Sequence, residues 1–293
     1  MSSRSALCLV ALGAVLGTAA GCRGVPNPLF TQLSEARALA ADLHVQFVKA
    51  ADASDRAVMA ETDEESVAFA REAERATQAV GGDITALGTR LQAIGFQTEA
   101  SLLQEFSARF ADYQKLDHGV LGLAVENTNL KAQRLSFGPV QEAANAFRDS
   151  LDAVAHAASA KNSCRTEALV ARAELAVREI QVLQAPHIAE PDDAAMAHLE
   201  AEMSQRETSA ADATTTLAGL AEPKMKPTVG AAVAALARFK ELSGQLIALS
   251  RRNTNVRSLA LALRQKPALM AACETSLAAL ESALAKETFS ATR

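Results

Sequence analysis

ENTNLK at residues 126–131 and RNTNVR at residues 252–257 are two copies of one motif, and they lie 126 positions apart. At the same offset, apolar residues of the two halves coincide at spacings of three, four and seven, which are the spacings of core positions on a helix. The coinciding pairs include Leu116 with Leu242, Val120 with Leu246, Leu123 with Leu249, Leu135 with Leu261, and Leu151 with Leu277. Helical periodicity alone does not demand a shared Asn-Thr-Asn, so we interpret the chain as an internal duplication.

The composition predicts an all-helical protein. Of the 293 residues, 49% are hydrophobic but only 4% are aromatic. Alanine and leucine, the strongest helix formers, are abundant, and the scarcity of aromatic residues argues against a β-sandwich or barrel. The formal net charge is −5. Since no basic stripe is present either, we expect no nucleic-acid partner.

The pattern predicts four helices in each copy. In the first copy, the second helix begins at a capping box formed by Thr62 and Glu65, and the pair Gly81-Gly82 is expected to kink it or stop it briefly. Pro139 and Pro267 fall early in the two fourth helices, at nearly equivalent places, so we expect a shared kink or break there.

Long helices joined by short loops pack antiparallel, in up-down-up-down order. We therefore predict an all-α fold of two tandem four-helix bundles stacked end to end, the first over residues 29–160 and the second over residues 161–288. Residues 149–184 contain neither proline nor glycine. They could form one continuous helix shared by the two bundles.

The N-terminus carries the features of a bacterial export signal. A polar, positively charged start precedes an apolar run at residues 6–16, which is too short to span a bilayer as a mature helix. Small residues then lead to Cys22 in the sequence TAAGC, which resembles a bacterial lipobox. We predict a signal peptide over residues 1–21 and a lipidated Cys22 with a tether over residues 22–28. Cleavage after Ala20 without lipidation is the alternative.

A lipidated N-terminus implies that a lipid bilayer is a partner of the protein. We expect the protein in the bacterial cell envelope, anchored to the outer membrane and facing the periplasm or the cell surface. After the signal we expect no segment that is long and apolar enough to span the membrane.

The third and fourth predicted helices of the first copy carry a further pattern. Aromatic residues on the third helix precede an apolar segment, a polar corner and an Ala-x-x-Leu start to the fourth helix, here Phe110, Tyr113, Val120, Leu123, Ala132 and Leu135. Residues 106–154 thereby resemble the last two helices of the four-helix-bundle sensor domain of bacterial methyl-accepting chemotaxis receptors. The resemblance implies a bundle outside the cytoplasm that is able to bind a small molecule. The sequence shows no transmembrane pair, linker domain or methylated coiled coil, so signalling by this chain alone is not implied.

Two cysteines remain after the signal and the lipidated position, Cys164 and Cys273. In an oxidising compartment an even remainder suggests a disulfide. If their helices are antiparallel neighbours in the second bundle, the two residues differ in level by about four residues, or ~6 Å of helical rise. The two alternatives are a Cys164–Cys273 disulfide and a pair of inert buried thiols.

Two groups of residues are candidates for a ligand site. Phe106, Phe110 and Tyr113 give the first copy the aromatic side chains that form pocket walls. At the two corners, amides can face a ligand and an arginine can hold a carboxylate or phosphate. This second group comprises Asn127, Asn129, Arg252, Asn253 and Asn255. The alternatives are a packed aromatic core, helix capping by the amides and an arginine on a solvated helix face.

The sequence shows no catalytic or metal-binding motif. None of the five histidines stands in an HExxH, a CxxCH or an i, i+4 histidine pair, and Asp117-His118 has no nucleophile at a defined spacing. We therefore predict no catalytic residue, metal or cofactor. The leading hypothesis is a non-enzymatic envelope lipoprotein whose bundles bind a small ligand or a partner protein. The alternative is a structural or assembly scaffold of an envelope complex.

Overall fold

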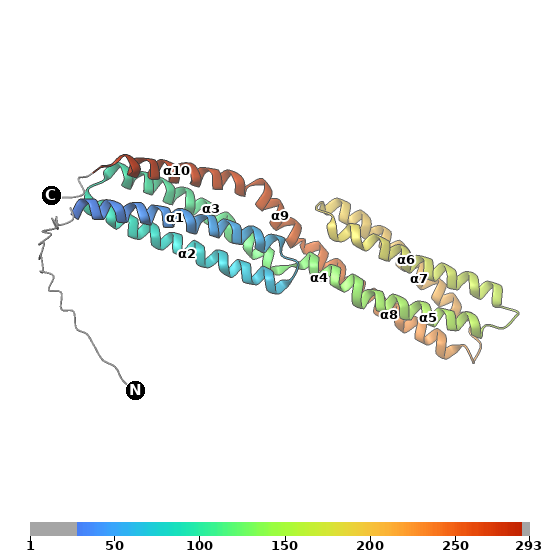
Figure 1. Cartoon of the computed structure of the whole chain (residues 1–293). Helices are drawn as coiled ribbons and strands as arrows, with labels where there is room; N and C mark the ends of the chain where they lie inside the picture. Colours follow the sequence, from blue (N-terminus) through green and yellow to red (C-terminus); the bar gives the residue numbers. More distant parts are fainter. Residues whose placement is uncertain (1–27, 289–293) are drawn as a thin grey trace, which may run out of the picture.

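The computed structural model describes residues 28–288, and this part of the chain contains helices but no strand (Figure 1). The predicted all-α fold class is confirmed. In chain order the helices are α1 (Pro28–Met59), α2 (Asp63–Ile94), α3 (Gln97–Glu126), α4 (Thr128–Leu135), the π-helical turn η1 (Ser136–Val140), α5 (Gln141–Ala157), α6 (Ser163–Ala189), α7 (Asp193–Leu220), α8 (Lys226–Arg252), α9 (Thr254–Arg264) and α10 (Lys266–Lys286). The predicted signal peptide, the lipidated Cys22 and the tether up to residue 27 lie outside the described residues and stay predictions.

The helices pack in two groups that lie end to end (Figure 1). Bundle 1 consists of α1, α2 and α3 together with α9 and α10. Bundle 2 consists of α4, η1 and α5 together with α6, α7 and α8. Each bundle therefore takes its fourth helix from the other copy of the repeat. We predicted instead that residues 29–160 form one bundle and residues 161–288 form the other.

The exchange follows from the backbone at the two Asn-Thr-Asn motifs. Asn127 and Asn253 each adopt a left-handed conformation, with φ values of 48° and 53°, which asparagine tolerates better than most residues. Each interrupts the helix for one residue only, between α3 and α4 and between α8 and α9. Figure 1 shows that the chain runs onward past each motif into the other bundle. The motifs are crossings between the bundles and not the reversing corners that we predicted.

The proposed continuous central helix is wrong. α5 ends at Ala157 and α6 begins at Ser163, and a hydrogen-bonded turn lies between them, with Asn162 N–H donating to Ser159 O at 2.9 Å. Because α5 and α6 pack side by side in bundle 2, the chain must reverse its direction here.

The expected helix breaks at glycine and proline residues are present at the prolines but not at the glycines. α2 continues through Gly81-Gly82, so the brief stop that was one of the two expected outcomes is wrong. The packing of α2 against α1 outweighs a cost of about 1 kcal/mol for each glycine. The breaks predicted near Pro139 and Pro267 are confirmed. η1 contains Pro139, and Gln265 separates α9 from α10, in whose first turn Pro267 lies.

One stretch within the described residues, Lys226–Lys286, contains a segment long and apolar enough to cross a membrane by length and composition alone. On those criteria, the expectation that no segment after the signal qualifies is wrong. The stretch corresponds to α8, α9 and α10. Leu277, Leu280 and Leu284 of α10 are buried in the core of bundle 1, so packing inside the protein accounts for part of this apolar character.

Of the two alternatives for the cysteines, the disulfide is wrong, because Cys164 and Cys273 are both free thiols. The alternative of two buried thiols holds for Cys273 but not for Cys164, which is exposed. The disulfide required the helices of the two cysteines to be neighbours in one bundle. Cys164 lies exposed near the start of α6 in bundle 2, whereas Cys273 lies on α10 in the core of bundle 1. The exchange of the fourth helices thus removes the proximity on which the disulfide depended.

Alkylation of the native protein distinguishes the two thiols. We expect iodoacetamide, without reductant, to modify Cys164 but not Cys273, because Cys273 is buried and burial raises its pKa to about 11. Peptide mass spectrometry identifies the modified residue, and denaturation before alkylation should expose both. Protection of both thiols in denaturant until a reductant is added would contradict this prediction.

Candidate functional site

The two Asn-Thr-Asn motifs meet face to face with reciprocal hydrogen bonds. The N–H of Thr128 donates to Thr254 Oγ1, and the N–H of Thr254 donates to Thr128 Oγ1, each at 3.1 Å. In the same way the N–H groups of Asn129 and Asn255 donate to each other's side-chain oxygens at 3.1 Å. Each motif therefore caps the first turn of the helix that follows the other motif.

The remaining side-chain bonds extend this junction. Asn129 Nδ2 donates to Asn253 Oδ1, and Asn255 Nδ2 donates to Asn127 Oδ1, both at 2.8 Å. Arg252 bridges to Glu126 at 2.7 Å. The five corner residues that we predicted as ligand contacts are thus brought together, and most of their hydrogen-bonding capacity is used inside the protein. The alternative of helix capping is the one that the geometry favours, although the cap comes from the other repeat.

The predicted aromatic residues also come together, as a packed core of bundle 1. Phe106, Phe110 and Tyr113 surround Phe47, with ring centroids 5.3–6.1 Å from that of Phe47 in edge-on geometry. None of the four rings is more than 3% exposed. They interlock with one another, and none of them lines the groove described below.

A buried lysine lies beside this aromatic core. Lys266, at the start of α10, is only 1% exposed, and its Nζ donates to Asp55 Oδ1 at 2.8 Å and to the carbonyl oxygen of Ala51 at 3.2 Å. Its third partner is the buried Asp117 of α3, with Nζ 3.3 Å from Oδ1. The ammonium also lies 5.8 Å from the centre of the Tyr113 ring, within range of a cation–π contact.

Burial and neighbouring charges act against each other on this cluster. Burial raises the pKa of Asp117, while Lys266 and hydrogen bonds, including one of 2.5 Å from the Ser54 hydroxyl, act to lower it. Burial also raises the pKa of Tyr113, and the carboxylates of Asp117 and Asp55 raise it further, so the phenol stays protonated. The lysine thus compensates a carboxylate that would otherwise be unpaired in the core.

The duplication shows that the fold does not need this cluster. At the 126-residue offset Lys266 corresponds to Val140, Asp117 to Ser243 and Tyr113 to Phe239. Val140 and Phe239 are fully buried in the core of bundle 2. Bundle 2 therefore has the same helical arrangement without an ion pair at these positions, so a role other than holding the bundle together explains the pair in bundle 1 best.

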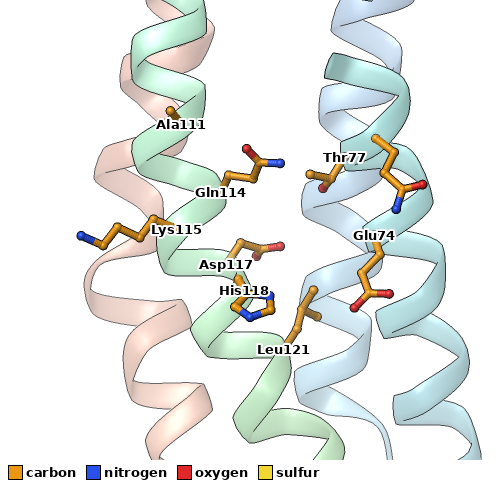
Figure 2. A pocket seen from close by; sticks show the side chains of 9 residues that line it. Glu74, Thr77, Ala111, Gln114, Lys115, Asp117, His118 and Leu121 are labelled. Atoms are coloured by element: carbon orange, nitrogen blue, oxygen red, sulfur yellow. The ribbon is translucent and has the colours of Figure 1, made fainter. Parts of the chain in front are cut away.

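Asp117 also lines an open groove of about 550 Å³ between α2 and α3 (Figure 2). Glu74 and Thr77 of α2 face Gln114, Asp117 and His118 of α3 across the groove, whereas the amine of Lys115 points away from α2. The Ser54 hydroxyl donates a hydrogen bond to Asp117 Oδ1, and the ion pair with Lys266 is made to the same oxygen. Neither of these two contacts occupies Oδ2; the Tyr113 hydroxyl is the other donor close to this carboxylate.

The corresponding residues of bundle 2 differ. Glu200, the counterpart of Glu74, is held by the guanidinium of Arg251 at 2.6 and 2.9 Å and by the buried His187 at 2.9 Å, and its pKa is lowered chiefly by the hydrogen bonds from Arg251. Among the described residues Glu74 has no such ion pair. The Thr77 position holds Met203, which is buried. At this position of the repeat, a carboxylate free to meet a ligand is thus present in bundle 1 but not in bundle 2.

No family model matches this sequence, and no curated protein matches it either. Sequence reasoning missed the role of Lys266 and the groove residues, although Asp117 and His118 were considered. The available signal was the difference between the copies: a lysine replaces a valine at an apolar helix position, and an aspartate replaces a serine.

Removal of the buried cation alone should destabilise the protein. Lys266→Met leaves the Asp117 carboxylate without its main partner in the core, and we expect the free energy of unfolding to fall by about 3–5 kcal/mol at neutral pH. A carboxyl whose native pKa is raised stabilises the fold when it is protonated, so lowering the pH through the native pKa of Asp117 should restore part of the loss. Urea denaturation at several pH values measures both effects.

The matched control is the double variant Lys266→Met/Asp117→Ser. It places an apolar residue and a serine at these positions, as Val140 and Ser243 do in bundle 2. Because it leaves no unpaired charge, it should recover most of the lost stability. A single variant as stable as the unaltered protein, or a double variant less stable than the single one, would contradict the assignment of the pair.

Proposed function

We propose that this chain is a non-enzymatic envelope lipoprotein whose bundle 1 binds a small ligand, rich in hydrogen-bond donors, in the groove between α2 and α3. The observation that carries the proposal is Asp117. This carboxylate is 3% exposed, is held in the core by Lys266, and still lines the groove. A buried charge fixed in this way is pre-oriented for a ligand, which reduces the entropy lost on binding.

The lining of the groove favours binding over catalysis. It contains no serine or cysteine that could act as a nucleophile, and its only histidine, His118, is exposed. Glu74 and Asp117 accept hydrogen bonds and carry negative charge, while Thr77 and Gln114 provide neutral polar contacts. A small amine or guanidinium compound with further polar groups fits this set of side chains best.

Anchoring through the predicted lipid on Cys22 would place bundle 1 next to the membrane. α1 begins at Pro28, six residues after Cys22. The start of α1 and the end of α10 both lie at the end of bundle 1 that is remote from bundle 2 (Figure 1). In this arrangement bundle 2 projects away from the lipid, in the bacterial envelope.

The second candidate function is a scaffold that holds a partner protein at a distance from the membrane. The end-to-end arrangement of the bundles in Figure 1 favours it. The 32 residues of α2 alone give bundle 1 a length of roughly 48 Å. A scaffold needs no occupied groove, so a ligand test separates the two functions.

Ligand binding should appear as a saturable rise in melting temperature with a small amine or guanidinium compound. At a hundred times the Kd, binding adds about 2.7 kcal/mol to stability. Glu74→Gln should weaken binding about 10-fold or more, since it removes a charged hydrogen-bond acceptor. Thr77→Met, which copies Met203 of bundle 2, should block the groove.

Arg109→Gln is the matched control, because Arg109 is an exposed residue of α3 that does not line the groove; it should leave binding unchanged. If no such compound raises the melting temperature, or if Thr77→Met leaves the rise intact, the proposal is wrong. Recovery of a stoichiometric partner from envelope membranes would then support the scaffold.

A further inference from the structure

A second, smaller cleft lies in bundle 2, between α5 and α6, and encloses about 320 Å³. Phe147 and Val177 form an apolar floor, and four polar residues stand around it: Arg148, Glu174, Arg178 and Gln181. This volume lies at the lower end of the range of small-molecule sites, which typically combine an apolar lining with a few convergent polar groups.

Two acceptor oxygens in this cleft are buried and have no hydrogen-bond partner: Glu174 Oε1 and Gln181 Oε1. The orientation of the Gln181 amide is fixed by a chain of bonds, since its Nε2 donates to Gln141 Oε1 at 2.8 Å and Gln141 Nε2 donates to Asn145 Oδ1 at 3.0 Å. A buried acceptor without a partner destabilises a protein, because the oxygen loses its hydrogen bonds to water and gains none in return. Both oxygens therefore call for a donor from outside the described protein residues.

The two arginines supply the opposite charge. Arg148 directs Nε and Nη2 to Oδ1 of the neighbouring Asp149, so its Nη1 is left for another acceptor. Arg178 forms no ion pair within residues 28–288. Burial and Asp152 raise the pKa of Glu174, while Arg148 and Arg178 act to lower it. Both guanidinium groups thus lie close enough to the buried carboxyl to influence it.

Bundle 1 has none of these groups at the matching positions. At the 126-residue offset, Glu174 corresponds to Val48, Arg178 to Asp52 and Arg148 to Glu274. In bundle 1, α10 packs on α1 without these charged groups. The corresponding packing of α5 on α6 in bundle 2 therefore does not require them.

We propose that the cleft between α5 and α6 is a second binding site, which takes a small zwitterion. The protonated amine of the ligand donates to Glu174 Oε1 and Gln181 Oε1, and its carboxylate or other anionic group accepts from Arg178 and from Arg148. The apolar floor contacts the carbon chain between the two charged ends. This site is separate from the groove of bundle 1 and does not depend on it.

The test is isothermal titration calorimetry of the full mature chain with four amino acids of increasing length: glycine, beta-alanine, gamma-aminobutyrate and epsilon-aminocaproate. At least one should bind with saturation. Its N-trimethylated form, which cannot donate a hydrogen bond from nitrogen, should bind at least about 10-fold more weakly. The n-alkylamine and the alkanoate of the same length should be similarly weakened, because each lacks one charged end.

Variants then locate the site. Glu174→Gln and Arg178→Gln should each weaken binding by about 10-fold or more. Arg172→Gln, an exposed change on the same helix where Arg172 contacts Ser209 outside the cleft, should not. Thr77→Met should also leave this binding unchanged. The proposal is overturned if none of the four compounds binds, which would leave the two oxygens to water, or if Thr77→Met abolishes binding while Glu174→Gln does not.

Discussion

The mutual capping of two Asn-Thr-Asn motifs is the interaction on which the rest of this structure depends. A helix begins with backbone N–H groups that have no partner inside the helix, and here α4 and α9 both begin in the buried junction between the bundles. Neither Asn127 nor Asn253 caps its own helix with its side chain. The donors are satisfied by Thr254, Asn255, Thr128 and Asn129 of the opposite repeat. Because each motif satisfies the other, the two chain segments must cross at the same level, and each fourth helix completes the other repeat's bundle.

Because of this crossing, the two bundles have the same helical arrangement. Their interiors differ in the residues that they contain. Bundle 1 holds the Lys266–Asp117 pair under an open groove, whereas bundle 2 has Val140 and Ser243 at those positions and engages Glu200 with Arg251. Bundle 2 has a cleft with two arginines and unpartnered acceptors, where bundle 1 has Val48 and acidic residues. Each half is thus a control for the other. Polar groups that occur in one half only are the best candidates for function, since the helical packing is stable without them.

Much of the fold followed from local sequence signals. Thr62 caps the start of α2, with the N–H of Glu65 donating to Thr62 Oγ1 at 3.1 Å, and Gly95 ends α2 with a left-handed φ of 79°. The exchange could not be predicted in this way, because heptad-like spacing specifies which face of a helix is buried but not which helix covers it. The errors over Cys164, Cys273 and the central helix all follow from that one ambiguity. The Lys266–Asp117 pair was missed because the two residues are 149 positions apart and only the exchange brings them together.

The exchange is tested most directly by a distance between spin labels on α1 and α10. His44 and Glu281 are suitable positions, because both are partly exposed and their side chains are 3.0 Å apart in bundle 1. Labels at His44→Cys and Glu281→Cys, in a Cys164→Ser background, should give a single pulsed-dipolar distance far shorter than the roughly 48 Å length of one bundle. If each repeat instead forms its own bundle, α10 lies with α6, α7 and α8. A distance equal to or longer than a bundle would then be observed, and it would contradict the crossed arrangement.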